Sequence, residues 1–344
     1  MIRTKQKFFS IIIPVLELGY FLIWECLPAL DKQTFKNFEV IVLPNNHSQY
    51  DTTLLKKYRW LRIIPTGIIT NPAQKRDLGA KHAKGTILAF LDDDSFPKEN
   101  WLESASIIFN QMQIASIGGP GIIPKNATLR EQAFDQILRS RAGSGSFSYR
   151  FEAKEPRFVD DFPSMNFFIQ KITFNTLGGF DSDYWPGEDS KLCEKIVKSK
   201  EHILYSPATV VFHHRRKTIQ DFLYQHRQYG FHRGSFFRHG DINSRHLIYL
   251  IPTFFVIYIV TFVLFSFITL VFKLNSLFLL GASLPLLFYW IVLNYIFFLT
   301  LIRTKNLLIA CITGVTYVST HIVYGIQFIQ GFFKPAEKKI SNKN

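Results

Sequence analysis

Three consecutive carboxylates, Asp92, Asp93 and Asp94, follow a short apolar run at residues 86–91. Such a run predicts a buried strand, and open α/β sheets bind ligands where their strands end. Asp92 and Asp94 would point to the same side, and two oxygen ligands this close suit Mg²⁺ or Mn²⁺. An acidic turn that caps the helix starting near Lys98 is the alternative. One cap needs a single Asp or Ser, however, whereas this turn supplies four.

A second pair of carboxylates, Glu188 and Asp189, follows Gly187 and precedes a helical run at residues 190–198. A carboxylate at a helix start can cap the helix, or it can act as a general base that reaches an acceptor hydroxyl. This motif alone favours the cap. Beside an independent aspartate cluster at residues 92–94, the base becomes the better interpretation.

The elements that must position these side chains follow the rhythm of a parallel α/β sheet, in which apolar runs alternate with longer mixed stretches. Asn71 and Pro72 mark the start of one helix, and Gly85 follows its end. Lys75 and Arg76 lie in its first turns, where cations oppose the helix dipole, so either a nearby anion or a solvated basic face explains them. The predicted strands occupy residues 8–13, 39–43, 61–64 and 86–91.

Two further segments are less regular. Residues 128–157 contain Gly-Ser-Gly-Ser within a polar, basic stretch, which predicts a mobile loop over the site. Near the N-terminus, basic residues precede an apolar stretch at 8–30 that resembles a signal peptide or anchor. Pro14, Glu17 and Glu25 interrupt that stretch, so we expect a strand followed by a helix.

Composition narrows the class of protein. The 344 residues carry a formal net charge of +14, which suits anionic lipid, phosphorylated substrates or nucleic acid. No nucleic-acid recognition module is visible, so we expect no nucleic-acid partner. The three cysteines form no C-x-x-C pair, which argues against a disulfide framework or a zinc site and fits a reducing, cytoplasmic setting.

The C-terminal part is strongly apolar. Its stretches at 247–272, 277–302 and 307–333 each exceed the roughly 20 residues that cross a bilayer, so we predict three spans. A buried helical core is the alternative, but soluble helices of this length show a polar face. The charged residues from 247 to 333 are Lys273, Arg303 and Lys305.

The topology of these spans is ambiguous. A cytoplasmic N-terminal domain places Arg303 and Lys305 inside, in agreement with the positive-inside rule. With three full spans, however, the basic tail at 334–344 would end outside, against the same rule. Either the tail charges are overruled or one segment does not cross fully, and His321 makes the third segment the suspect.

Just before the first span, residues 213–246 hold six of the ten histidines and seven Arg or Lys, interleaved with aromatic residues. A basic, aromatic segment next to a membrane helix predicts an interfacial connector that binds lipid headgroups and gathers phosphorylated substrates.

Together these features resemble the family 2 glycosyltransferases with the GT-A fold, over roughly residues 8–235. Ser10–Glu17 is similar to that family's first strand and nucleotide-binding turn, and Gln74–Ala80 to its donor-binding helix. Asp92–Asp94 sits at its DxD motif, and Gly187–Asp189 matches its acceptor-side motif. Membrane helices follow the catalytic domain in many members.

The resemblance implies a role for each motif. Asp92 would contact the nucleotide and Asp94 the Mn²⁺ or Mg²⁺ ion on the diphosphate, while Asp189 would be the general base. His213 or His214 falls where GT-A enzymes often carry a histidine near the metal. The candidate site comprises Asp189 as the catalytic residue, Pro14, Glu17, Asn46, Arg76, Asp92 and Asp93 at the donor, Gly187 and Glu188 at the acceptor, and Asp94 and His213 at the metal.

The chain departs from the family pattern in three places. After the second strand, Pro44–Ser48 replaces the usual acidic residues, with Asn46 in place of a base-reading carboxylate, so the nucleobase stays open. Asp77 stands where the family usually has Asn. The processive members carry Gln-x-x-Arg-Trp, whereas Gln225–Tyr229 lacks the Trp, so we expect addition of a single sugar.

We therefore expect a GT-A catalytic domain, which is α/β and Rossmann-like with a mostly parallel sheet, followed by C-terminal transmembrane helices. Its limits would be 1–212 for the catalytic domain, 213–246 for the connector, 247–333 for about three helices and 334–344 for the tail.

The expected activity is metal-dependent inverting transfer, in polysaccharide biosynthesis, from a nucleotide-sugar donor to a lipid-linked or growing cell-surface saccharide. The protein would be integral to the plasma or inner membrane, with a cytoplasmic catalytic domain. The main alternative is a non-catalytic membrane protein, such as an export component, whose α/β domain only binds a nucleotide sugar. The altered turn at Asn45 and Asn46 supports it, whereas the apolar spans oppose a transporter.

Overall fold

A computed structural model of the chain describes residues 8–180, 187–275 and 277–334. These residues divide into two compact units that do not follow the chain in simple order. The first contains residues 8–124, 149–180 and 187–214, and the second contains residues 125–148, 215–275 and 277–334. The functional limits drawn at residues 212 and 246 stay predictions, and the basic tail beyond Lys334 lies outside the described residues.

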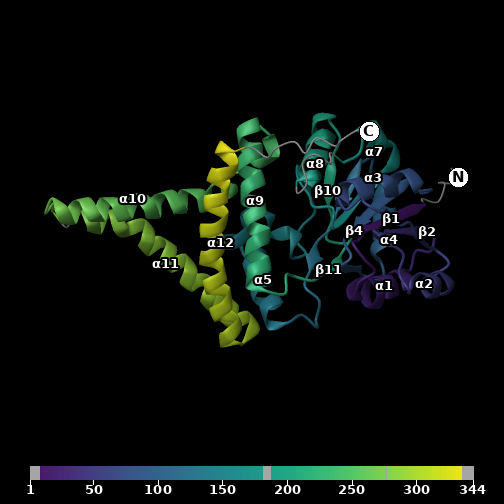
Figure 1. The fold of residues 1–344 in the computed structure, drawn as a ribbon, viewed down its shortest axis with the longest axis horizontal. Helices are drawn as coiled ribbons and strands as arrows, with labels where there is room; N and C mark the ends of the chain where they lie inside the picture. The colour runs from purple at the N-terminus through teal and green to yellow at the C-terminus, as the bar shows by residue number, and fades with distance from the viewer. Residues whose placement is uncertain (1–7, 181–186, 276, 335–344) are drawn as a thin grey trace. The chain divides into compact units, whose positions relative to one another are not determined.

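An eight-stranded sheet forms the centre of the first unit, in the order β3-β2-β1-β4-β9-β6-β10-β8. Strands β2, β1 and β4 of this sheet are labelled in Figure 1. The half from β3 to β4 is parallel, and β9 is antiparallel to both of its neighbours. The expected mostly parallel sheet is confirmed, and the four predicted strands lie within one residue of their expected bounds. The strands are β1 (Phe9–Pro14), β2 (Phe38–Leu43), β3 (Leu61–Ile63), β4 (Ile87–Leu91), β6 (Ser116–Gly118), β8 (Arg157–Val159), β9 (Asn166–Gln170) and β10 (Ile203–Tyr205).

The central strands β1, β2 and β4 are buried along their whole length, which explains why their sequences are nearly continuous apolar runs rather than alternating ones. Their side chains and those of the surrounding helices form one apolar core. The helices of this unit are η1 (Leu22–Cys26), α1 (Leu27–Asp31), α2 (Asp51–Lys57), α3 (Pro72–His82), α4 (Trp101–Gln111), α7 (Lys171–Thr176) and α8 (Glu188–Lys198).

Helix α3 begins as its sequence predicts. The Asn71 side chain accepts a hydrogen bond from the Ala73 amide at 2.8 Å, and Pro72 takes the first helical position. Gly85 is not part of the helix end, because α3 stops at His82. A Cβ at position 85 would lie 2.6 Å from the backbone nitrogen of Ser10. Glycine is thus needed where the chain enters β4 beside β1.

A small second sheet brings distant parts of the chain to the end of β4. It has the order β5-β11-β7, with β5 (Ser95–Pro97), β11 (Val211–His213) and β7 (Gly121–Ile122). The antiparallel pairing of β11 with β5 sets His213 opposite Ser95. His213 therefore lies beside the aspartate turn, which is formed by Asp92, Asp93 and Asp94, although more than a hundred residues separate the two in sequence.

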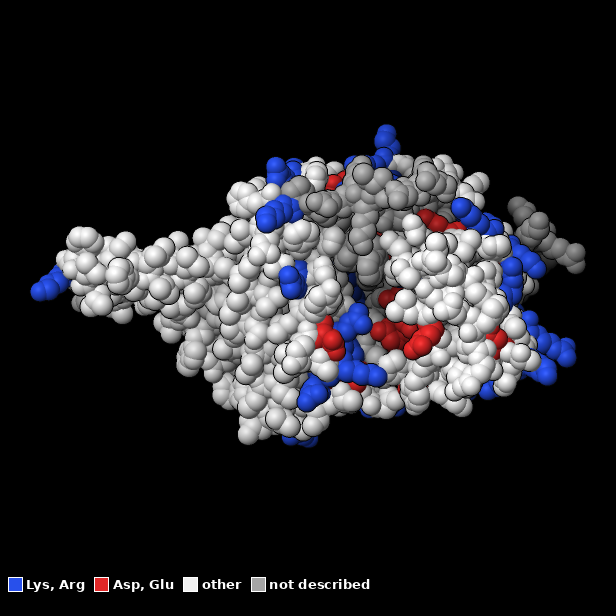
Figure 2. Space-filling model, in the orientation of Figure 1, with Lys and Arg blue, Asp and Glu red and all other residues white. Residues whose placement is uncertain are grey.

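The second unit is helical. Three of its helices, covering Leu247–Val271, Leu277–Thr304 and Leu307–Phe333, are long and apolar enough to cross a membrane, and their bounds agree with the predicted spans. The surface of the α10–α11 projection, at the left of Figure 2, shows almost no charged side chains except at its far end. The helices are α5 (Leu129–Arg139), α6 (Arg141–Ser144), α9 (Ile219–His239), α10 (Ile251–Val271), α11 (Leu277–Thr304) and α12 (Leu307–Phe333), with 3₁₀ turns η2 (Gly145–Arg150), η4 (Ile242–Ser244) and η5 (Leu247–Tyr249).

The mobile loop predicted at residues 128–157 is wrong. Thr128 and Glu131 form a reciprocal capping box at the start of α5, which satisfies two of the free amides at that helix end. Phe134 then stacks on Phe222 of α9, with ring centroids 4.4 Å apart. Packing of this kind stabilises a helix whose polar composition and neighbouring glycines conceal it in the sequence.

Candidate active site

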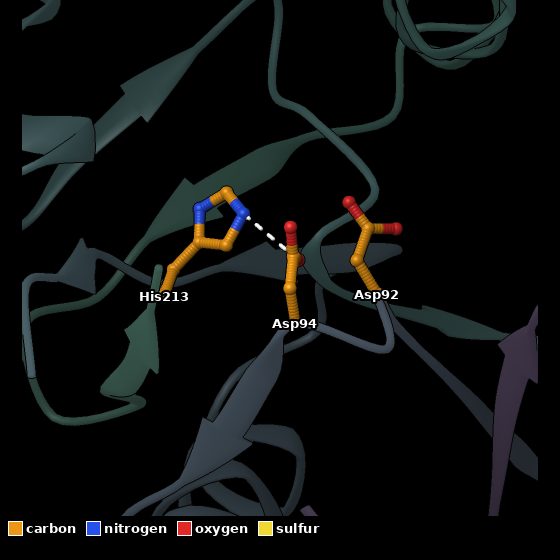
Figure 3. A group of neighbouring side chains, drawn as sticks. All are labelled: Asp92, Asp94 and His213. Carbon is orange, nitrogen blue, oxygen red and sulfur yellow. Dashed lines mark ion pairs between the residues drawn. The ribbon is translucent and has the colours of Figure 1, made fainter. Parts of the chain in front are cut away.

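The aspartate turn and β11 bring three possible metal ligands together. Asp92 and Asp94 follow the end of β4, and with His213 they offer one ligand atom each, all within 4.8 Å of one another. Figure 3 shows the three side chains converging, with the His213 ring turned toward Asp94. The Nε2 atom of His213 lies 3.1 Å from Oδ1 of Asp94.

This arrangement fits a divalent ion. In octahedral coordination with bonds of about 2.1 Å, neighbouring ligand atoms lie about 3 Å apart, which matches the spacing of Asp94 and His213. Two carboxylates and an imidazole form a donor set that suits Mn²⁺ or Mg²⁺. The side chains of Asp92, Asp94 and His213 are 34%, 24% and 21% exposed, so a diphosphate can reach the remaining coordination positions.

The structure distinguishes the two neighbouring histidines. The His214 ring bonds Glu25 at 2.8 Å and stacks on Phe21, with ring centroids 4.2 Å apart. Its backbone amide donates to the carbonyl of Asp94. His214 therefore supports the turn, while His213 faces the carboxylates.

Arg76 links the aspartate turn to the second acidic motif. Its buried guanidinium donates to Asp92 and to Glu188, each at 2.9 Å, and so joins α3, the end of β4 and the start of α8. Burial alone would lower the pKa of Arg76, but the carboxylates of Asp92, Asp189 and Glu188 raise it, so the side chain stays charged. Arg76 is therefore paired with anions inside the protein and is not part of a solvated basic face.

Lys75, the preceding residue, has a different task. Its buried ammonium group donates to the carbonyl oxygens of Val15 and Leu43, beyond β1 and at the end of β2, and to Oδ1 of Asn45. The Asn45 side chain in turn donates to the carbonyl of Gly67 at 3.1 Å. The unusual Asn45 thus belongs to a hydrogen-bond network that ties strand ends together, and burial lowers the pKa of Lys75.

Asp189 has the surroundings of a candidate base. Its Oδ2 accepts a hydrogen bond from the Ser164 amide at 3.1 Å, whereas its buried Oδ1 has no hydrogen-bond partner among the described residues. Burial raises the pKa of Asp189, and burial together with the charge of Asp189 raises the pKa of Glu188 to about 7. A carboxylate held this way is a stronger proton acceptor than one in water.

The other predicted residues lie at the same edge of the sheet. Pro14 ends β1, and Glu17 and Asn46 are exposed in the segments that follow β1 and β2. Asp93 is half-buried between Asp92 and Asp94. Gly187 precedes α8 with a φ of 130°, a conformation that favours glycine.

Two features of the site could not be read from sequence. The Ser164 contribution is a backbone N–H, which any residue but proline supplies, so no side-chain type marks it. Asp77, the departure from the family pattern, accepts a hydrogen bond from the Phe180 amide at 2.9 Å, a role that an Asn side chain can also fill. Burial raises the pKa of Asp77 to about 6.

Comparison with known proteins shows which family this chain resembles. Residues 10–138 match the family model described as Glycosyl transferase family 2. This part of the chain is therefore similar to a family 2 glycosyltransferase domain. The match begins in β1 and ends in α5, so it includes Arg76 and the aspartate turn, while Asp189 and His213 lie beyond it.

The relatives of this domain are distant. The pre-mycofactocin glycosyltransferase of Mycobacterium tuberculosis is 26% identical over 164 residues, which cover 46% of this chain and 33% of that protein. The chain thus spans about a third of that relative's length. A Methanococcus voltae protein, named dolichyl N-acetyl-alpha-D-glucosaminyl phosphate 3-beta-D-2,3-diacetamido-2,3-dideoxy-beta-D-glucuronosyltransferase, is 22% identical over 259 residues, 72% of this chain and 78% of the relative.

Among solved structures, the mannosyltransferase PcManGT from Pyrobaculum calidifontis, in complex with GDP-Man and Mn²⁺, is similar to the whole chain. The similarity covers 96% of this chain and 89% of the other, with a TM-score of 0.57 and 15% sequence identity. Together with the family match and the mostly parallel sheet, it confirms the expected GT-A fold followed by C-terminal apolar helices.

Proposed function

We propose that this protein is a membrane-bound glycosyltransferase that moves one sugar from a nucleotide-sugar donor to an acceptor hydroxyl, with inversion at the anomeric carbon. One observation carries the proposal. Through Arg76, the candidate metal ligand Asp92 is joined to the acceptor-side motif that contains Asp189, so both halves of a transfer reaction meet at one sheet edge.

Asp94 and His213, with Asp92 beside them, would hold a divalent cation. When bound, such an ion neutralises charge on the diphosphate leaving group, an effect of several kcal/mol in metal enzymes. The family match and the GDP-Man and Mn²⁺ complex of the similar structure support a nucleotide-sugar donor and this class of ion. Pro14, Glu17, Asn46 and Asp93 would line the donor side.

Asp189 would act as the general base, with Gly187 and Glu188 setting its position at the start of α8. Its Oδ1, which has no hydrogen-bond partner among the described residues, takes the proton of the acceptor hydroxyl while the acceptor oxygen bonds to the anomeric carbon. The bond from that carbon to the diphosphate oxygen breaks, and the electron pair leaves with the nucleoside diphosphate. A positioned base contributes about 10²–10⁴-fold to such a rate.

The acceptor we propose is a lipid-linked saccharide or a growing surface polysaccharide. The name of the Methanococcus voltae relative contains a dolichyl phosphate sugar, and three helices of this chain are long and apolar enough to cross a membrane. The basic connector then holds phosphorylated lipid near the headgroups. We place the catalytic domain in the cytoplasm at the plasma or inner membrane, because that orientation agrees with Arg303 and Lys305.

The non-catalytic alternative loses its best support in this structure. It rests on the altered turn at Asn45 and Asn46, but Lys75 and Gly67 engage the Asn45 side chain in a structural network. A domain that only binds a donor has no need for a buried carboxylate oxygen with no partner among the described residues, as found at Asp189.

A donor panel tests the proposal. Detergent-solubilised protein is incubated with UDP-sugars and GDP-sugars in Mn²⁺, Mg²⁺ or EDTA, and released nucleoside diphosphate is measured. We expect metal-dependent release from one donor, lost in Asp94→Asn and kept in Glu155→Gln, which removes an exposed carboxylate. Donor binding is measured on the same samples, and binding of no donor under any condition would reject the proposal.

A further inference from the structure

The three long apolar helices have different surroundings within the second unit. In the most apolar 18-residue stretch of each helix, 6% of the residues of α10 and 11% of those of α11 are buried, whereas half of those of α12 are buried. Large apolar side chains are exposed along the whole length of α10 and α11, as expected for helices that face lipid. Helix α12 exposes one apolar stripe with helical spacing, formed by Leu308, Cys311, Val315, Ile322 and Ile326.

The covered side of α12 packs tightly along α9. A Cβ at Gly230 would lie 2.5 Å from the carbonyl oxygen of Tyr324, and one at Gly234 would lie 2.1 Å from that of Phe328. Since each step of four residues along α9 matches four along α12, the two helices run in the same direction. Small residues let their backbones approach this closely.

Helix α9 has a polar outer side. Asp221, Arg227 and Arg238 are exposed on it, and Arg238 donates to the carbonyls of Phe332 and Phe333 at the end of α12. If α12 crossed the bilayer, α9 would cross beside it, with Arg227 close to the middle. An arginine at that depth strongly disfavours insertion into the bilayer.

The direction of the helices points the same way. In Figure 1, α10 and α11 leave the α9–α12 pair as a hairpin, and α12 runs across the direction of α10. The chain turns between α11 and α12 at Lys305, which has a φ of 52°, and Asn306 then caps α12. Helices that cross one another in this way do not all lie along the membrane normal.

We infer that only α10 and α11 cross the bilayer, and that α12 lies along the membrane surface beside α9, with its apolar stripe in the lipid. The catalytic unit leads directly into α9 through Arg215 and lies on the same side. This arrangement resolves the conflict with the positive-inside rule. Arg303, Lys305 and the basic tail share one side, and Lys273 alone marks the other.

Cysteine labelling tests the topology without any need for activity. In a Cys311→Ser background, where Cys26 and Cys193 are buried, single cysteines are placed as Lys56→Cys, Asn275→Cys and Ser341→Cys. A membrane-impermeant maleimide is added to sealed vesicles of known orientation, before and after permeabilisation. We expect Lys56→Cys and Ser341→Cys to react from one face and Asn275→Cys from the opposite face.

Two results would overturn the inference. Reaction of Ser341→Cys and Asn275→Cys from one face, with Lys56→Cys reacting from the opposite face, would mean that α12 crosses the bilayer. Reaction of all three from a single face would mean that the α10–α11 hairpin does not cross. Each variant is first checked for the elution volume of the parent protein on gel filtration, so that unfolded protein is not scored.

Discussion

At the scale of single residues, the site depends on carboxylates held in unequal surroundings. Asp92 and Asp94 are partly exposed and ready for a cation, whereas Glu188 is buried and Asp189 half-buried, and burial raises the pKa of both. The same residue type therefore serves two tasks because its environment differs. Arg76 holds the two pairs together.

Asp189→Asn tests the base directly. The Asn side-chain oxygen can still accept the Ser164 amide, so we expect the fold to survive while donor turnover falls by about 10²–10⁴-fold. Nucleoside diphosphate release and thermal unfolding are measured on the same preparation. Normal turnover in a folded Asp189→Asn protein would remove Asp189 from the mechanism.

Arg76→Ala leaves Glu188 buried without its cation, and we expect a loss of about 3–5 kcal/mol in the free energy of unfolding. Arg76→Lys keeps the charge, but one ammonium group does not replace a fork that reaches two carboxylates, so turnover should still drop at least tenfold. Arg59→Ala, at an exposed arginine, is the control and should behave like the parent. Equal stability of Arg76→Ala and Arg59→Ala would contradict the linking role.

Asp77→Asn has a predicted pH dependence. Because burial raises the pKa of Asp77 from 3.8 to about 6, the folded state holds its proton longer than the unfolded state, so the parent loses stability as pH rises from about 4 to 6. Asn accepts the same Phe180 amide without this loss. We expect the variant to be about 3 kcal/mol more stable at pH 7 and equal to the parent below pH 4. Chemical unfolding across this range measures the difference, and a gap that does not change with pH would refute it.

At the scale of elements, the sequence was most informative where one local cause decided the structure. Continuous apolar runs predicted β1, β2 and β4, and Asn71 with Pro72 predicted the start of α3. Contacts between segments that are distant in the chain could not be predicted from the sequence. No residue near Arg76 in the sequence indicates that its partner is Glu188, which follows 112 residues later. Helix α5 is stabilised by contact with Phe222 rather than by its own helix propensity.

The α9–α12 contact yields a prediction about packing. Gly234→Leu would force side-chain atoms against the backbone of α12, so we expect the unfolding temperature in detergent to fall, with a cost of about 1–3 kcal/mol or more. Gly281→Leu in α11 is the matched control, because a Cβ there meets nothing within 4 Å. Equal unfolding temperatures for the two variants would show that α9 and α12 do not pack this closely.

At the scale of the whole molecule, the α/β unit and the helical unit have different roles. The first holds the described candidate site residues, and the second holds the apolar helices together with α5, which the chain contributes from between β7 and β8. The single figure of +14 for the net charge conceals this division, because basic residues cluster outside the apolar spans. Composition alone therefore suggested several anionic partners, and the arrangement of residues was needed to choose among them.

The most direct test of the central claim is calorimetric binding of UDP and GDP to the detergent-solubilised protein in the presence of Mn²⁺. The parent protein, Asp94→Asn and Asp189→Asn are compared, and donor turnover is measured in parallel. If one sheet edge holds a donor half and an acceptor half, Asp189→Asn keeps metal-dependent nucleotide binding while turnover is lost, and Asp94→Asn loses both. Metal-independent binding that is unchanged in Asp94→Asn would contradict the account.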